Sequence, residues 1–175
     1  MWSAGFEFVG CRRAIVSGFK RRFWNYSYDH RGTCENPGLV VCAVETQCDS
    51  DIVDGLVLDI PSDDLERVLD LLDMREKCGY MRKITRAFDH SSRNEIGDVF
   101  IYCAYLDDPG IEVFVQPRNG VDNTRGELEQ LAALIRSAEG SSGKNIEYLN
   151  RLFETLVNWG IVDCHIFTLY EICSQ

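Results

Sequence analysis

A charged stretch from Leu72 to Tyr80, LDMREKCGY, contains the carboxylates with the clearest chemical potential. Asp73 and Glu76 are three residues apart, so a helix would present both on the same side. A carboxylate in such a place can remove a proton from a substrate as a general base and return it as a general acid. The run of charges around Glu76 is also typical of a helix end that simply faces water.

The stretch from Asp29 to Thr33, DHRGT, is typical of a turn, with an aspartate that can cap it and a glycine with permissive backbone angles. Arg31 could bind a carboxylate of a substrate at this turn. A catalytic pair of His30 with Cys34 or Asp29 is an alternative, but neighbours on a turn rarely point together. The pattern therefore favours a turn, with Arg31 as a candidate for binding.

Tyr148 lies in a third polar stretch, SGKNIEYL, from Ser142 to Leu149. On the face of a helix its ring is expected to pack in the core of the protein. Tyrosine is amphipathic, so its hydroxyl can form a hydrogen bond while the ring packs, and the sequence leaves these two roles open.

Helices and strands must position these residues. The residue pattern of much of the chain before residue 107 predicts strands. Segments rich in β-branched and aromatic residues occur at 14–19, 39–44, 52–60, 81–88 and 99–106. Turn-forming residues are frequent between the first two of these segments, and a polar loop is predicted between the last two.

A helix is predicted after Pro61, where the period of the apolar residues changes from two to about 3.6. Asp63 and Glu66 are spaced as a capping box at its start. Gly79 can adopt the left-handed conformation that ends helices, so Glu76 is expected in the last turn.

The last third of the chain predicts helices. Thr124 and Glu127 are spaced as a capping box, Gly160 closes a second apolar stripe, and Asp163 can cap a short final helix. The apolar stripes consist of Leu128, Leu131, Leu134 and Ile135, and of Tyr148, Leu149, Leu152, Phe153, Leu156 and Val157. Strands first, one inserted helix and helices at the end favour an α+β domain with a curved antiparallel sheet partly covered by helices.

The composition limits the class of protein. A chain of 175 residues, 45% hydrophobic and 26% charged, has the size of one globular domain with a real core. Its net charge of −10 disfavours binding to nucleic acid or to anionic lipid. The locally basic run at 12–22 is interleaved with aromatic residues and predicts a strand edge and a packed corner. No apolar stretch approaches the roughly 20 residues that cross a bilayer, so no membrane is predicted as a partner.

Eight cysteines are scattered along the chain without a CxxC pair and without a signal peptide ahead of them. This pattern is typical of reduced thiols in the cytosol. Cys42 and Cys103 lie in apolar runs, where a thiol behaves as a small core side chain. The three histidines are far apart and none has ligand spacing to a cysteine, so no metal site is predicted.

Taken together, the polar stretches resemble one family. RRFW at Arg21–Trp24, the DHRGT turn, the LDMREKCGY segment and SGKNIEYL are similar, in order and approximate spacing, to motifs of the ChaC family of glutathione-specific γ-glutamylcyclotransferases. Each piece alone is weak, but a nine-residue segment flanked by further matches is specific. The resemblance runs from Trp2 to the last predicted helix.

The resemblance implies an enzyme that cleaves glutathione to 5-oxoproline and cysteinylglycine without a cofactor or a metal. The α-amino group of the γ-glutamyl unit attacks its own γ-carbonyl and expels the amine of cysteinylglycine. The family's motif assigns the acid/base carboxylate to Glu76 rather than Asp73. It also implies that Tyr148 binds the γ-glutamyl head, and it makes Arg31 and Tyr80 further candidates for substrate binding.

The resemblance also implies a single γ-glutamylcyclotransferase-like domain over residues 1–175, with a curved sheet or a small β-barrel flanked by helices. The expected location is the cytosol, with glutathione as the partner. The oligomeric state stays open.

The N-terminus departs from the family pattern. Members of the family open with a strand that leads into a YGSL motif, and Met1-Trp2 aligns with the two residues after that motif. We therefore expect a domain that lacks its first strand and the loop whose N–H groups meet the substrate. Loss of a single oxyanion donor commonly costs about 10²–10³ in rate. The alternative is thus an impaired, non-enzymatic binding module. Leu39, where the family usually has arginine, is a second departure.

Overall fold

The structure is a computed structural model that describes residues 4–46, 48–76, 79–104 and 122–175. The chain forms two compact units that interleave in sequence. Unit 1 comprises Met1–Lys20 and Ala43–Asp108, and unit 2 comprises Arg21–Cys42 and Pro109–Gln175.

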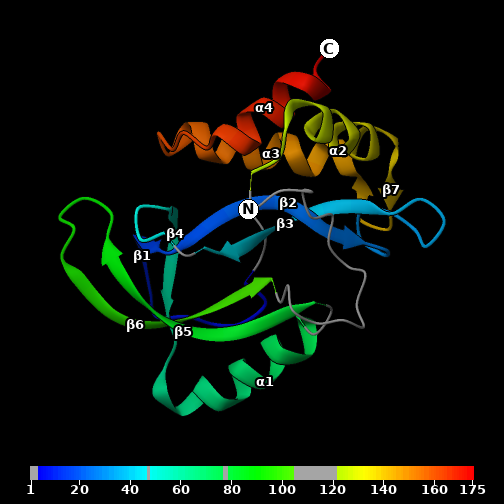
Figure 1. Cartoon of the computed structure of the whole chain (residues 1–175). Helices are drawn as coiled ribbons and strands as arrows, with labels where there is room; N and C mark the ends of the chain where they lie inside the picture. Colours follow the sequence, from blue (N-terminus) through cyan, green and yellow to red (C-terminus); the bar gives the residue numbers. More distant parts are fainter. Residues whose placement is uncertain (1–3, 47, 77–78, 105–121) are drawn as a thin grey trace. The chain divides into compact units, whose positions relative to one another are not determined.

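Unit 1 is a curled sheet with one helix (Figure 1). Its strands are β1 (Gly10–Ser17), β4 (Ile52–Asp59), β5 (Tyr80–Asp89) and β6 (Glu95–Ala104), in the order β6-β5-β1-β4. Neighbours in this order run antiparallel. A 3-10 turn, η1 (Ser62–Asp64), leads from β4 into helix α1 (Leu65–Arg75).

The core of unit 1 lies on the inner face of this sheet. Ala14, Val16, Ala87 and Cys103 are buried there, because alternate residues of a strand face the same side. The prediction that Cys103 is a core side chain is confirmed, and burial raises the pKa of its thiol.

Unit 2 combines two strands with three helices. Its elements are most of β2 (Phe19–Ser27) and β3 (Gly38–Glu45), α2 (Arg125–Ser137), the short strands β7 (Glu139–Gly140) and β8 (Gly143–Lys144), α3 (Asn145–Asn158) and α4 (Cys164–Cys173). The helices pack on one another and lie on one side of β2 and β3 (Figure 1). The largest fully buried side chains of this unit are Phe23, Trp24, Leu39, Leu131, Ile135, Leu149, Ile166 and Leu169.

The predicted sheet needs two corrections. The segment predicted at 14–19 is divided at Gly18 between β1 and β2, and β2 continues to Ser27, beyond the prediction. Phe23 and Trp24 are consecutive and both buried, so β2 lacks the alternation that identifies a half-buried strand. The sheet is also not wholly antiparallel, because the last residues of β3 run parallel to β6, with Ala43 opposite Cys103.

Four of the five predicted signals for helix ends are present, including Gly160, which has a left-handed φ of +65° two residues after α3 ends. Thr124 and Glu127 form the expected capping box, and Asp163 accepts a hydrogen bond from the Ile166 amide at 3.1 Å. Gly79 takes the predicted left-handed conformation, with φ +82°, although α1 already ends at Arg75. The capping box predicted at Asp63 is wrong, because this residue lies in the 3-10 turn that precedes α1.

The basic run at 12–22 is neutralised by carboxylates within each unit. Its ion pairs are Arg12–Asp59, Arg13–Asp54, Lys20–Asp51, Arg21–Asp163 and Arg22–Asp122. A patch that binds phosphates would present such cations to solvent instead. These pairs agree with the prediction that the run forms a strand edge and a packed corner.

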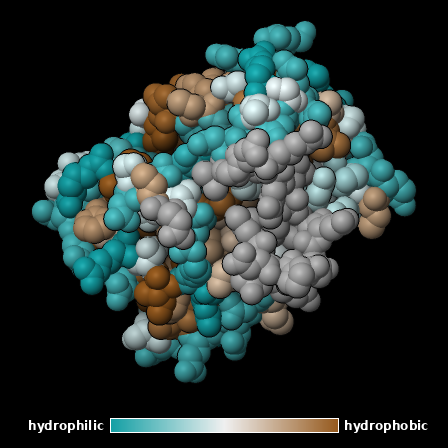
Figure 2. Space-filling model, viewed as in Figure 1, coloured by the Kyte–Doolittle hydropathy of each residue, from teal (hydrophilic) through white to brown (hydrophobic). Residues whose placement is uncertain are grey.

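The described surface is mostly hydrophilic on the face that Figure 2 shows, with apolar residues in separate groups. Singly exposed apolar residues are normal on globular proteins, so these groups do not by themselves mark a partner surface. Within the part of the chain that the structure describes, no helix has both the length and the apolar character needed to span a membrane.

His165 supplies a pH-dependent contact in unit 2. Its Nε2 accepts a hydrogen bond from the Phe23 amide at 2.9 Å, and its burial, followed by the positive charge of Arg22, lowers its pKa from 6.5 to about 3. The folded state therefore keeps His165 neutral, whereas the unfolded chain takes up a proton near pH 6.5.

We accordingly expect acid to weaken the fold through His165. Its contribution to the free energy of unfolding is fully present above pH 6.5 and falls by up to about 1.4 kcal/mol per pH unit as the pH drops toward 3. Urea titrations at several pH values measure this slope. His165→Gln, whose amide oxygen can accept the same bond without protonation, should show a shallower loss. Equal slopes in the two proteins would contradict the assignment.

Candidate active site

The structure divides the three polar stretches between the two units. The Leu72–Tyr80 stretch joins α1 to β5 in unit 1, and its Lys77 and Cys78 lie outside the described residues. The DHRGT turn and the SGKNIEYL segment both belong to unit 2. Glu76 and Tyr80 are therefore considered with unit 1, and Arg31 and Tyr148 with unit 2.

Glu76 is the C-cap of α1, one position after the last helical residue and beyond the last turn in which it was expected. Its amide still donates to the Leu72 carbonyl at 2.8 Å, but its backbone, with φ −95° and ψ 11°, has left the helical conformation. Its side chain is about one quarter exposed, at 24%, and its Oε1 accepts a 2.7 Å hydrogen bond from Arg75 Nε. The carboxylate is thus held in place while solvent or a substrate can still reach it.

Asp73, the competing carboxylate, links α1 to the sheet of unit 1 through two side chains. It accepts a 2.5 Å hydrogen bond from the Tyr102 hydroxyl and forms a 3.0 Å ion pair with Arg82. Burial, and then the bond to Asp73, raise the pKa of Tyr102 to about 12, so the phenol stays protonated as a donor. This engagement favours Glu76 over Asp73 as the group that moves a proton.

Tyr80 is the first residue of β5 and lies opposite Ala104 of β6. It is half-buried, so its side chain is partly available to a ligand. A binding role for Tyr80 remains a prediction.

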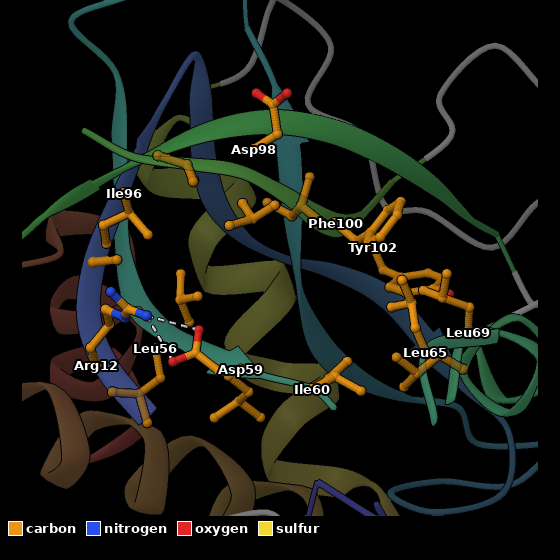
Figure 3. A pocket seen from close by; sticks show the side chains of 18 of the residues that line it. Arg12, Leu56, Asp59, Ile60, Leu65, Leu69, Ile96, Asp98, Phe100 and Tyr102 are labelled. Carbon is orange, nitrogen blue, oxygen red and sulfur yellow. Dashed lines mark hydrogen bonds and ion pairs between the residues drawn. The ribbon is translucent and has the colours of Figure 1, made fainter. Parts of the chain in front are cut away.

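Unit 1 contains a cavity of about 570 Å³ between its two outer strands (Figure 3). Consecutive residues of β4 (55–59) and β6 (98–102) line it, although successive side chains of a strand point to opposite faces. Arg12, Ala14 and Val16, alternate residues of β1 that face the same side of the sheet, also line it, so the cavity lies over one face of β1 and extends to β4 and β6. Figure 3 shows the labelled residues of β6 across from those of β4, with Leu65 and Leu69 of α1 at one end.

The cavity reaches the helix that bears Glu76. Leu72, one turn before Glu76, is part of its lining, and so is Tyr102, the partner of Asp73. The lining is otherwise mostly aliphatic and aromatic, with the Arg12–Asp59 pair as its clearest charged feature. Such a surface offers few partners for the charged head of an amino acid, so the cavity alone does not make a γ-glutamyl site.

In unit 2, Tyr148 combines the two roles that its sequence left open. Its ring packs edge-on against Phe23 at 5.4 Å, and its hydroxyl oxygen accepts a 3.3 Å hydrogen bond from the Val41 amide. Burial raises the pKa of Tyr148 well above its ordinary range. The phenol is therefore neutral at physiological pH and keeps a proton that it can donate.

Arg31 is buried, at 7% exposed, which is unusual for a residue predicted to bind substrate from a turn. Its guanidinium donates to the Lys144 carbonyl at 3.1 Å, lies 3.9 Å from a Glu147 carboxylate oxygen and stands 5.7 Å from the centre of the Tyr148 ring. The structure thus brings Arg31 and Tyr148 together in unit 2. These contacts favour a role in which Arg31 positions Tyr148, while its binding to substrate stays a prediction.

Close backbone packing explains the glycine that precedes the SGKNIEYL segment. A Cβ atom on Gly140, just before SGKNIEYL, would lie 2.5–2.6 Å from backbone atoms of residues 30–32. The Ser141 and Ser142 amides donate to the Asp29 and His30 carbonyls, both at 2.9 Å. The DHRGT turn therefore packs directly against the β7–β8 ribbon that precedes α3.

The alternative pair at this turn is solvent-exposed. Contrary to the expectation for turn neighbours, Asp29 and His30 approach each other, with 3.6 Å between carboxylate oxygen and Nε2. His30 Nδ1 also lies 3.2 Å from Ser142 Oγ, but the Asp29 and His30 side chains are 74% and 71% exposed. Cys34 is an exposed free thiol. Water competes for such groups, so the pair gives no protected catalytic centre.

Asn145 is a site-forming residue that the sequence analysis did not identify. Its side chain is fully buried and bonds both backbone groups of Leu39, accepting from the amide and donating to the carbonyl, each at 2.7 Å. Asn145 and Tyr148 are three residues apart on α3, and together they hold the backbone of β3. A buried polar residue at the start of an apolar helix is the signal that could have revealed it.

Among the described residues, no group of three or more His, Cys, Asp or Glu side chains is placed to hold a metal ion. The candidate groups for chemistry remain the Glu76 carboxylate in unit 1 and the Tyr148 hydroxyl in unit 2.

Comparison with known proteins adds independent evidence. A family model described as ChaC-like protein matches residues 1–175. The chain is 30% identical to the glutathione-specific gamma-glutamylcyclotransferase 1 of Danio rerio, over 88% of this chain and 73% of that protein. It is 29% identical to gamma-glutamylcyclotransferase 2-3 of Arabidopsis thaliana, over 97% of this chain and 81% of that protein.

A solved structure shares the fold. The crystal structure of a glutathione-specific γ-glutamyl cyclotransferase from yeast superimposes with a TM-score of 0.79 at 24% identity, covering 95% of this chain and 88% of that one. The predicted γ-glutamylcyclotransferase-like fold, with helices around a curved sheet, is thereby confirmed.

Proposed function

The chain belongs to the ChaC-like family, and from this premise we propose that it cleaves glutathione to 5-oxoproline and cysteinylglycine. The observation that carries the proposal is the contrast between the two carboxylates of the Leu72–Tyr80 stretch. Asp73 binds two side chains from the sheet, Tyr102 and Arg82, whereas Glu76 pairs through Oε1 with its neighbour Arg75. Relatives that carry the same activity in their names support the choice of substrate.

The reaction needs little beyond placement and proton transfer. The substrate's α-ammonium first loses a proton, and its nitrogen then attacks the γ-carbonyl carbon of the same molecule. A new C–N bond closes the ring, and the ring nitrogen loses a second proton. The amide C–N bond to cysteine breaks, and the departing nitrogen takes up one proton to leave as an amine, which gains another in water to become an ammonium. Glu76 accepts a proton from the attacking nitrogen and donates one to the leaving nitrogen. Because both reacting groups belong to one molecule, the enzyme's main further task is to fold it into the attack geometry.

Tyr148 is the proposed contact for the γ-glutamyl head. A neutral phenol can donate to a carboxylate of the substrate while its oxygen still accepts from the Val41 amide. Arg31 supports this side chain from its buried position beside the ring. Tyr80 is proposed as a further binding residue.

Tyr148→Phe should raise KM and lower kcat/KM by about tenfold or more, the cost of one hydrogen bond to a charged group. Tyr170→Phe is the matched control, because Tyr170 lies in the same unit but stacks on Phe153 at 3.8 Å. Steady-state kinetics with glutathione measure both variants, and urea titrations show whether either one loses stability. An unchanged kcat/KM in a folded Tyr148→Phe protein would remove Tyr148 from the site.

The proposed function itself is tested with the purified chain and glutathione. Chromatography should detect cysteinylglycine and 5-oxoproline in equal amounts, and γ-glutamylalanine as a second substrate reports the preference for glutathione. A folded chain that releases neither product would favour the alternative of a non-enzymatic binding module.

The proposed compartment is the cytosol. In the described parts of the chain, seven cysteines are free thiols, which is typical of a reducing environment. Cell fractionation with an antibody to the chain tests this location.

A further inference from the structure

Arg75 occupies an unusual place between the candidate carboxylate and the N-terminal segment of unit 1. Its Nε donates to Glu76 Oε1 at 2.7 Å, and its Nη1 donates to the Ala4 carbonyl at 2.9 Å. One guanidinium therefore connects two parts of the chain that are 71 residues apart in sequence.

The pair depends on where α1 ends. Neighbouring residues within a helix do not face each other, so Arg75 and Glu76 could not pair in this way if the helix continued. Because Glu76 has left the helical conformation, its side chain turns back toward the last helical residue. The end of α1 at Arg75 thus creates the contact.

The N-terminal segment is itself part of the structure around the cavity. Phe6 lines the cavity, and the Val9 amide donates to the Asp59 carbonyl at 2.8 Å, beside the start of β1. The bond from Arg75 to Ala4 therefore fixes one end of a segment whose other end is tied to β4.

We propose that Arg75 is a positioning residue for the reaction, holding Oε1 of Glu76 against the N-terminal segment so that Oε2 transfers the proton. This inference rests on the proposed function of Glu76. A planar guanidinium presents its donors in a rigid fork, so it can fix two acceptors at once, which an ammonium group does poorly. Arg75 acts through Glu76 and does not itself react with the substrate.

Arg75→Ala should lower kcat by about 10- to 100-fold with little change in KM, because a small misplacement of a catalytic group has effects of this size. Millimolar guanidinium added to this variant should restore part of the lost kcat. Arg75→Lys keeps the charge but not the fork and should stay impaired. Exposed ion pairs contribute little to stability, so all variants are expected to fold.

Arg67→Ala is the matched control, since Arg67 lies on the same helix and forms an exposed ion pair with Asp64. It should keep full activity and show no response to guanidinium. Amide-exchange mass spectrometry gives a second measurement that does not depend on activity. In Arg75→Ala, but not in Arg67→Ala, residues 4–9 should exchange faster.

The outcomes separate this inference from the proposed function. If the wild-type chain cleaves glutathione and Glu76→Gln does not, an active Arg75→Ala protein overturns the role of Arg75 alone. A loss of kcat that guanidinium does not restore also overturns it, in favour of a merely structural role. If the wild-type chain is inactive, the proposed function fails. Unchanged amide exchange of residues 4–9 in Arg75→Ala would overturn the inference that Arg75 holds the N-terminal segment.

Discussion

Replacement of Glu76 by glutamine is expected to lower the turnover of glutathione by about 10²–10⁴, the usual contribution of a general acid/base group. Glutamine has nearly the same shape and can still accept the hydrogen bond from Arg75, but it cannot take up and return a proton. Glu76 is partly exposed, so its replacement should leave the free energy of unfolding almost unchanged. A loss of rate in a stable protein would therefore report chemistry.

The measurement is the rate of cysteinylglycine release by wild type and variant at matched protein concentration, with urea titrations of both. Asp73→Asn is the control on the same helix. It weakens the links to Tyr102 and Arg82, so we expect it to cost more stability than Glu76→Gln and much less turnover. The reverse pattern of rates would transfer the acid/base role to Asp73.

Replacement of Asn145 by alanine is expected to have the largest effect on stability among the changes considered. The substitution leaves the Leu39 amide and carbonyl without the side chain that now bonds both of them. Each buried polar group left unsatisfied costs about 1–3 kcal/mol, so the two groups together should lower the free energy of unfolding by about 2–6 kcal/mol. Urea or thermal unfolding measures this loss.

Asn158→Ala provides the same chemical change at the exposed end of the same helix and should alter stability by less than about 0.5 kcal/mol. A further consequence of Asn145→Ala concerns Tyr148, whose hydroxyl bonds the Val41 amide two residues further along β3. We therefore expect an increase in KM under conditions where the variant is folded. A variant as stable as Asn158→Ala would show that water replaces the amide at no cost.

The two hydrogen bonds from Asn145 to the Leu39 backbone also bear on the departure from the family pattern at this position, where the family usually has arginine. Asn145 bonds the backbone of Leu39, and any residue supplies those groups. The leucine side chain is fully buried, so its identity affects packing and not the attachment of α3 to β3.

Short sequence patterns predicted the features that depend on residues only a few positions apart, such as helix caps. Thr124 and Asp163 cap α2 and α4 as expected, because a capping bond spans three residues of sequence. Gly79 has the predicted left-handed conformation, which a glycine adopts without steric cost. At Asp63 the local pattern failed, since the chain enters α1 through a 3-10 turn after β4.

Long-range pairing was not accessible to such patterns. The parallel contact of Ala43 with Cys103 joins residues 60 positions apart, and no local signal gives the direction of a distant partner strand. Strand β2 was missed because Phe23 and Trp24 are both buried, which removes the alternation on which strand prediction depends.

The sequence by itself determined the family, through the motif from Leu72 to Tyr80, and with it the choice of Glu76 as the candidate acid/base group. Only the tertiary structure decided what surrounds each candidate. Tyr102 and Arg82 both bind the Asp73 carboxylate. Arg75 donates hydrogen bonds to both the Ala4 carbonyl and Glu76. The buried Arg31 guanidinium lies beside the Tyr148 ring. The physical reason is that residue type and spacing define which contacts a side chain can make, whereas the packing of distant segments selects which of them form.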